Sequence, residues 1–203
     1  MGRILVGSVV ILSLLCASHV FGDSSKDGYL ISYRGSVSLP EEVAFRTWLS
    51  LMKGVRDHPE IAESLVAEAL DIDLDSRSGH TEAASFVTAF QEMHRELRID
   101  RAASIAPTLC SSELKDKRFD EIVDTLNTLE MVKRNVTTDY LSIAYEMLSP
   151  EQETAFKAHL NEMKKSITHS EIDSGAVYDK QPGRDIRSDL DQLCSRVQTR
   201  AQR

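Results

Sequence analysis

The 203-residue sequence has little glycine, proline, cysteine or aromatic residue. Nine glycines leave little material for a loop that cradles phosphates, and the Walker, G-x-G-x-x-G, G-x-S-x-G and H-E-x-x-H motifs are all missing. Basic residues are outnumbered by acidic ones, 24 to 32. Because nucleic acids and anionic membrane surfaces attract clustered cations, this balance predicts neither as a partner. We expect no enzyme of the common hydrolase or nucleotide-binding kinds.

The N-terminal 22 residues carry the pattern of a cleaved signal peptide. Arg3 supplies a positive start, and a nearly unbroken apolar run of 14 residues follows from Ile4 to Ala17. This run is shorter than the ~20 residues that a membrane-spanning helix needs, so cleavage after Gly22 is favoured over a stable membrane anchor. Removing residues 1–22 takes away one basic residue and changes the net charge from −8 to −9. The pattern predicts export to the periplasm or the extracellular space.

The cysteines agree with export. Cys16 leaves with the signal peptide, and Cys110 and Cys194 remain. An even number of cysteines in an exported chain favours a disulfide between them. Two buried free thiols are the alternative.

Helix signals recur along the chain from residue 38 onward, while strand-like alternation is nearly absent. The fold class predicted is all-α, a bundle of six to eight amphipathic helices in one domain at 38–203. An extended or disordered arm is expected at 23–37. A stretch rich in turn residues predicts a loop at about 169–184.

Several helix boundaries can be predicted from capping and proline signals. Pro59 is expected to start a helix that ends at Leu70, and Thr81 to cap the following one. One helix is expected from about 112 to 134. Ser149 to Gln152 form a capping box with proline at the first helical position. A last helix carries its apolar stripe from Ile186 onward.

The segment DIDLDSRSGHTE, from Asp71 to Glu82, resembles an EF-hand calcium loop. Carboxylates stand at loop positions 1, 3, 5 and 12: Asp71, Asp73, Asp75 and Glu82. In that family, oxygen ligands at alternating positions wrap Ca²⁺ and a bidentate Glu at position 12 completes the site. The resemblance implies a calcium site, with the carbonyl of Arg77 at position 7.

Two residues depart from the EF-hand pattern. Ser76 stands where the family has the glycine of a sharp turn, and Ser78 where an aliphatic residue is usual. The alternative is an acidic linker between helices, with Thr81 capping the next helix. Ca²⁺ is the only cofactor that the sequence suggests.

The segment from Leu148 to Gln152 is similar to the LTxxQ motif of small helical periplasmic chaperones and stress sensors, with Ser149 in place of Thr. The resemblance implies binding of unfolded clients on a concave helical surface. A capping box explains Ser149 and Gln152 without any family.

Other patterns have simpler explanations. His94, His159 and His169 lie near carboxylates, but solvated polar faces account for them better than metal sites. Ser112 begins an S-x-x-K pattern without its companion motifs and is expected to be a helix cap. Asn135 begins a glycosylation sequon, expected on a turn between helices.

These observations predict an exported, non-enzymatic helical protein that binds a protein or peptide partner, with a chaperone-like role as one form. Met-bearing amphipathic helices suit variable apolar partners. The alternative function is calcium binding at 71–82.

Overall fold

The computed structural model describes residues 40–166 and 186–202, and within them it has seven helices and no strand. The helices are α2 (Glu41–Gly54), α3 (Pro59–Leu70), α4 (Arg77–Leu109), α5 (Ser112–Asp116), α6 (Phe119–Glu146), α7 (Pro150–Ser166) and α9 (Ile186–Ala201). The predicted all-α bundle is confirmed. The expected signal peptide at 1–22, arm at 23–37 and loop at 169–184 lie outside the described residues.

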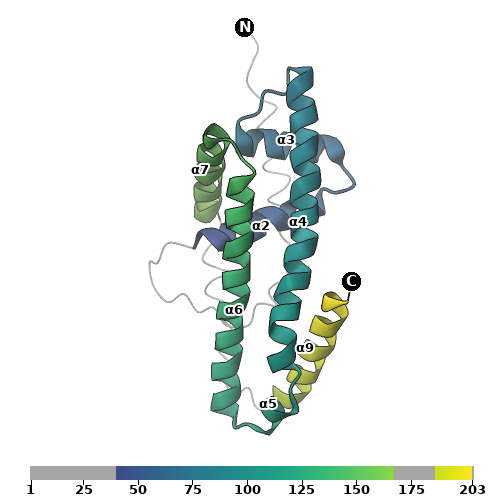
Figure 1. Cartoon of the computed structure of the whole chain (residues 1–203), viewed down its shortest axis with the longest axis vertical. Helices are drawn as coiled ribbons and strands as arrows, with labels where there is room; N and C mark the ends of the chain where they lie inside the picture. The colour runs from purple at the N-terminus through teal and green to yellow at the C-terminus, as the bar shows by residue number, and fades with distance from the viewer. Residues whose placement is uncertain (1–39, 167–185, 203) are drawn as a thin grey trace.

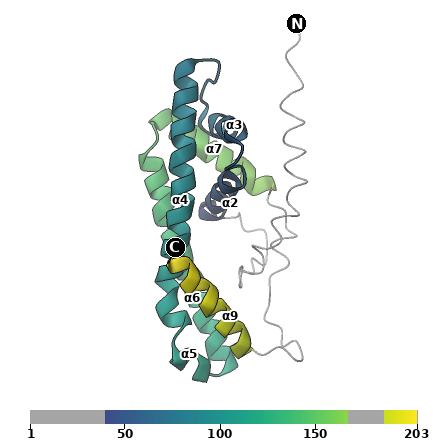
Figure 2. The same cartoon turned by 90° about the vertical axis from the view of Figure 1, so that its right-hand side faces the viewer.

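Helix α4 is the element on which the bundle is assembled (Figure 1). Its 33 residues correspond to a length of about 50 Å. Helices α2 and α3 pack against its N-terminal half, α9 packs against its C-terminal half, and α6 runs beside it (Figure 1, Figure 2). The molecule is therefore elongated along α4.

The upper core lies where α2, α3, α4, α6 and α7 meet. It centres on Trp48, whose ring lies 6.0 Å from Phe90 and 5.9 Å from Phe156, between ring centroids, in edge contacts. Phe45 and Phe156 make a further edge contact at 6.3 Å. Such aromatic pairs each add about 0.5–1.5 kcal/mol to the burial of their surfaces. This cluster joins α2, α4 and α7 although α7 follows α2 by almost a hundred residues.

The lower core is separate and aliphatic. It contains buried side chains of α4, α5, α6 and α9: Ala102, Ile105, Leu109, Leu114, Ile122, Leu126, Leu129, Leu190, Leu193 and Val197. Helix α9 closes this core from one side (Figure 2).

A charged layer separates the two cores where α4 passes from Leu97 to Ala102. Glu130 is buried there and pairs with Lys133, and Arg134 Nη2 donates to Glu42 Oε1 at 2.6 Å. Burial, together with the nearby Arg46, lowers the pKa of Arg101 to about 10. Since buried ion pairs roughly balance their own desolvation, the stability of the bundle comes mainly from the apolar clusters on either side.

Helix α3 starts and ends at the predicted residues, but other boundaries were predicted wrongly. Helix α4 begins at Arg77, four residues before Thr81, because Ser76 caps it. The helix expected at 112–134 is divided into α5 and α6, since Lys117 and Arg118 are extended. Helix α6 then continues to Glu146.

The sequon at Asn135 lies within α6 and not on a turn. Thr137 is only 2% exposed, and its hydroxyl donates to the carbonyl of Lys133. Asn135 itself is exposed. Burial of Thr137 against the bundle keeps this segment helical although Asn, Val and Thr are weak helix formers.

The histidines were also predicted wrongly as parts of solvated faces. His94 is 9% exposed, and the ring of His159 lies 5.2 Å from that of Trp48, between centroids. Burial, with Arg98 and Lys53 nearby, lowers the pKa of His94 to about 4. Burial also lowers the pKa of His159, while Glu68 opposes the shift. His169 lies outside the described residues.

We predict that acid destabilises this protein through His94. The imidazole has a pKa of about 4 in the folded protein and 6.5 as its ordinary value. Between these values the unfolded chain binds more protons, so the free energy of unfolding falls as pH drops from 6.5 to 4. The loss approaches about 3 kcal/mol. Urea unfolding of His94→Gln from pH 7 to 4 should show a shallower pH dependence than wild type. Substitution of the exposed His58 should not flatten it, and an unchanged slope in His94→Gln would contradict the prediction.

Candidate functional site

The two segments that resemble known motifs meet at one end of the bundle. A pocket of about 250 Å³ lies between the α3–α4 connection and the start of α7. Its polar lining includes Asp71, Asp73, Ser78, Glu82, Glu151 and Gln152. Three of the four predicted calcium ligands are among these residues, and two residues of the LTxxQ-like segment face them. This pocket is the candidate site.

The first wall of the pocket is the turn after α3. Asp71 ends α3 in the left-handed conformation, with φ of 54°, and the amide of Ile72 donates to the carbonyl of Ala67 at 2.9 Å. This is the usual way to end a helix, although glycine is the common residue there. The amide of Asp75 then donates to Asp73 Oδ1 at 2.9 Å. The Asp73 carboxylate therefore already accepts a hydrogen bond within the turn.

The start of α4 completes this wall. Ser76 Oγ accepts from the amide of Gly79 at 3.0 Å and donates to the carbonyl of Asp73 at 3.1 Å. A Cβ at position 79 would lie 1.8 Å from that carbonyl oxygen. Only glycine allows α4 to approach the turn this closely.

The second wall is the start of α7, where the predicted capping box is confirmed. The amide of Gln152 donates to Ser149 Oγ, and Gln152 Oε1 accepts from the amide of Ser149 at 3.1 Å. Hydrogen bonds that the carboxylate accepts from its own backbone amide and from the Ser149 hydroxyl lower the pKa of Glu151. Capping thus explains the residues that resemble the LTxxQ motif.

One hydrogen bond joins the two walls. Gln152 Nε2 donates to Glu82 Oε1 at 2.7 Å, across 70 residues of sequence. Glu82 is position 12 of the EF-hand-like segment, where the resemblance implies a calcium ligand. In the structure this carboxylate holds the capping residue of α7 instead.

The predicted calcium ligands are not arranged as in an EF-hand. Arg77 to Glu82, positions 7 to 12, all belong to the first turns of α4. Within residues 40–166 and 186–202, no three His, Cys, Asp or Glu side chains form a group that could hold a metal ion. Asp71, Asp73 and Glu82 line the pocket, and Asp75 does not.

The S-x-x-K pattern has a structural role. Ser111, not the expected Ser112, caps α5 by accepting from the amide of Leu114 at 3.2 Å. Lys115 forms an ion pair with Asp191 of α9. The S-x-x-K pattern is therefore explained by α5, the short helix in the turn between α4 and α6.

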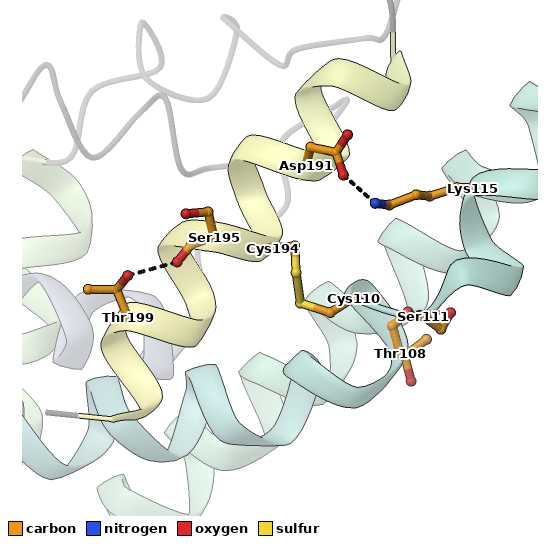
Figure 3. The surroundings of a disulfide bond; sticks show 8 residues. All are labelled: Thr108, Cys110, Ser111, Lys115, Asp191, Cys194, Ser195 and Thr199. Carbon is orange, nitrogen blue, oxygen red and sulfur yellow. Dashed lines mark hydrogen bonds and ion pairs between the residues drawn. A yellow bond between two sulfur atoms is a disulfide. The ribbon is translucent and has the colours of Figure 1, made fainter.

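The predicted disulfide is present in the structure. Cys110 and Cys194 are bonded, with their Cα atoms 5.1 Å apart and a sequence separation of 84 (Figure 3). The bond joins the end of α4 to α9. In the described part of the chain, none of the helices is long and apolar enough to cross a membrane.

Sequence reasoning missed the contact between Glu82 and Gln152 and the role of Gly79. No local signal marks a contact between residues 70 positions apart. Gly79 lies inside the EF-hand-like segment Asp71–Glu82. The EF-hand pattern, however, requires its glycine at position 6, which is Ser76 here. Comparisons with protein families, with curated proteins and with solved structures find no match for this chain.

We predict that Gly79→Ala destabilises the protein strongly. The added Cβ must displace the carbonyl of Asp73 and with it the turn after α3, at a cost of about 2–3 kcal/mol. Gly54→Ala is the matched control, because a Cβ there meets no atom within 4 Å. Its effect should stay within about 1 kcal/mol. Urea unfolding of the two variants measures the difference, and equal stabilities would contradict the prediction.

We predict that calcium leaves the protein unchanged, because the carboxylates of Asp73 and Glu82 are engaged in turn and capping contacts. Calorimetric titration with Ca²⁺ should give no heat of binding, and the Tm should be the same in millimolar Ca²⁺ and in excess EDTA. A Tm raised by Ca²⁺ in the wild type and not in Asp73→Asn would instead establish the calcium hypothesis.

Proposed function

We propose that this chain is an exported, non-enzymatic helical protein that binds an apolar segment of a protein or peptide partner. The observation that carries the proposal is a pair of exposed apolar side chains at the C-terminal end of α6, one on its last turn and one at its C-cap. Ile143 is 46% exposed and Met147 is 39% exposed. Residues four apart share one face of a helix, so the two side chains form one surface.

This surface continues an apolar stripe. Val136 and Tyr140 precede Ile143 at helical spacing and pack against the upper core as partly buried residues. The Tyr140 hydroxyl donates to Asp100 Oδ2 at 2.6 Å, which fixes the stripe against α4. The exposed pair therefore stands on a rigid support. A rigid apolar surface loses little conformational entropy when a partner binds it.

The charge around the pair indicates the kind of partner. Asp139 and Glu146, four residues before and three residues after Ile143, are exposed on the same helix. The whole chain carries a net charge of −8. A segment with apolar side chains flanked by Lys or Arg complements this surface. Met147 adds adaptability, because its unbranched thioether packs against varied apolar shapes.

Two features favour an extracytoplasmic setting. The pattern at 1–22 is that of a signal peptide, and the Cys110–Cys194 bond suits an oxidising compartment. Chaperone-like binding of unfolded clients is the form of the proposal that the similarity at Leu148–Gln152 suggests.

The test compares two surfaces of α6. Met131 is 64% exposed and lies twelve residues from Ile143, about a third of a turn around the helix. We expect the full chain to suppress aggregation of reduced insulin at near-stoichiometric ratios, measured by light scattering. Ile143→Ser/Met147→Ser should lose most of this suppression, and Met131→Ser should keep it.

Binding of a labelled, Lys-rich amphipathic peptide provides the second measurement. Fluorescence anisotropy should show at least a tenfold weaker affinity for the double variant than for Met131→Ser, since the double variant lacks the two exposed apolar side chains that the peptide covers on binding. The proposal is wrong if the wild type neither suppresses aggregation nor binds the peptide. It is also wrong if the two variants behave alike.

A further inference from the structure

Arg101 on α4 is a partly buried cation whose guanidinium lacks a full set of hydrogen-bond partners. Its Nε atom is buried and, in the described part of the chain, donates to no acceptor. Glu130, the buried carboxylate of the charged layer, acts electrostatically on Arg101 but pairs with Lys133. A charged group in a protein interior is costly unless hydrogen bonds or an opposite charge compensate it. Arg101 therefore has a donor to offer to a further anion.

Two further arginines approach Arg101 from neighbouring helices. Burial and the positive charge of Arg46 on α2 lower the pKa of Arg101, and Arg200 on α9 adds to this effect. On α9, Val197 packs in the lower core with Ala102, and Arg200 follows it by three residues. Figure 2 shows the C-terminal end of α9 beside α4, a short way below α2. The three guanidinium groups therefore gather around one level of α4.

The two carboxylates of the charged layer are already matched by cations of α6. Glu130 pairs with Lys133. Glu42, one turn before Arg46 on α2, accepts from Arg134 at 2.6 Å. The arginines of α2 and α4 therefore give this layer a local surplus of positive charge, although the net charge of the chain is −8.

We propose that Arg101, together with Arg46 and Arg200, forms a binding site for a small multivalent oxyanion, phosphate or sulfate. A guanidinium group presents planar N–H donors that match the oxygens of such an anion. All three arginines are partly exposed, so the cluster is open to solvent. One arginine comes from each of α2, α4 and α9, and a bound anion therefore joins these helices at the boundary between the two cores.

The acidity of the whole chain is compatible with this site. At physiological ionic strength, charges in solvent are screened over about 8 Å, so the nearest side chains decide which ion binds. A divalent anion meets several cations at once and gains more from them than a monovalent one does. We therefore expect phosphate and sulfate to bind better than acetate or chloride.

Thermal unfolding of the full chain in matched salts tests the site. At pH 7 and equal ionic strength, the Tm should be about 2–5 °C higher in millimolar phosphate or sulfate than in chloride or acetate, because an anion that binds only the folded protein stabilises it. Calorimetric titration with inorganic phosphate should give saturable binding of one ion per chain.

Substitution of single arginines locates the site. Arg101→Met keeps the apolar stem of the side chain and removes its charge, so the gain in Tm from phosphate should disappear. In chloride this variant should be at least as stable as the wild type, since removing a poorly compensated charge is not costly. Arg46→Met should bind phosphate about tenfold more weakly. Arg95→Met is the matched control, because Arg95 is exposed on the same helix and pairs with Glu92. It should respond to phosphate like the wild type.

Three results would overturn the proposal. The same Tm of the wild type in phosphate, sulfate and chloride would show that no site exists. An equal phosphate response of Arg101→Met and Arg95→Met would show a general salt effect. A gain in acetate as large as that in phosphate would show that the cluster does not select multivalent oxyanions.

Discussion

The packing of α4 against four other helices is the constraint on which the structure depends. Its buried residues run from Gly79 to Leu109 and serve both cores. Because one continuous helix provides a wall to each core, the upper and lower clusters have fixed positions although they share few other elements. The charged layer crosses α4 at Arg101, between the two apolar clusters. A break in α4 at this level would separate the two cores.

The start of α4 also shows which structural features could be predicted from the sequence alone. The apolar spacing of Phe86, Phe90 and Met93 was sufficient to predict a helix, and Pro59 and Leu70 were predicted as the limits of the one before it. The cap was placed four residues late. What fixes the true start is the approach of Gly79 to the carbonyl of Asp73, a backbone contact that no side-chain pattern records.

The division between α5 and α6 has a similar explanation. The stretch at 112–134 contains no proline or glycine, so a continuous helix was the natural prediction. The chain must nevertheless turn there, because α6 returns beside α4 (Figure 1). The extended residues Lys117 and Arg118 make that turn. The break between α5 and α6 is therefore set by tertiary packing and not by the local helix preference of these residues.

The candidate site was predicted in its parts but not in its assembly. Asp71–Glu82 and Ser149–Gln152 each have the residue types of a known motif, and each is explained by helix ends. Their meeting depends on α7 packing against α2 and α3, which places Gln152 next to Glu82. The carboxylate of Glu82 and the capping residue Gln152 therefore tie the start of α7 to the start of α4. At the lower end, α9 packs against α4 and is also bonded to it through Cys110 and Cys194, so each end of α4 is fixed by contacts between residues far apart in sequence.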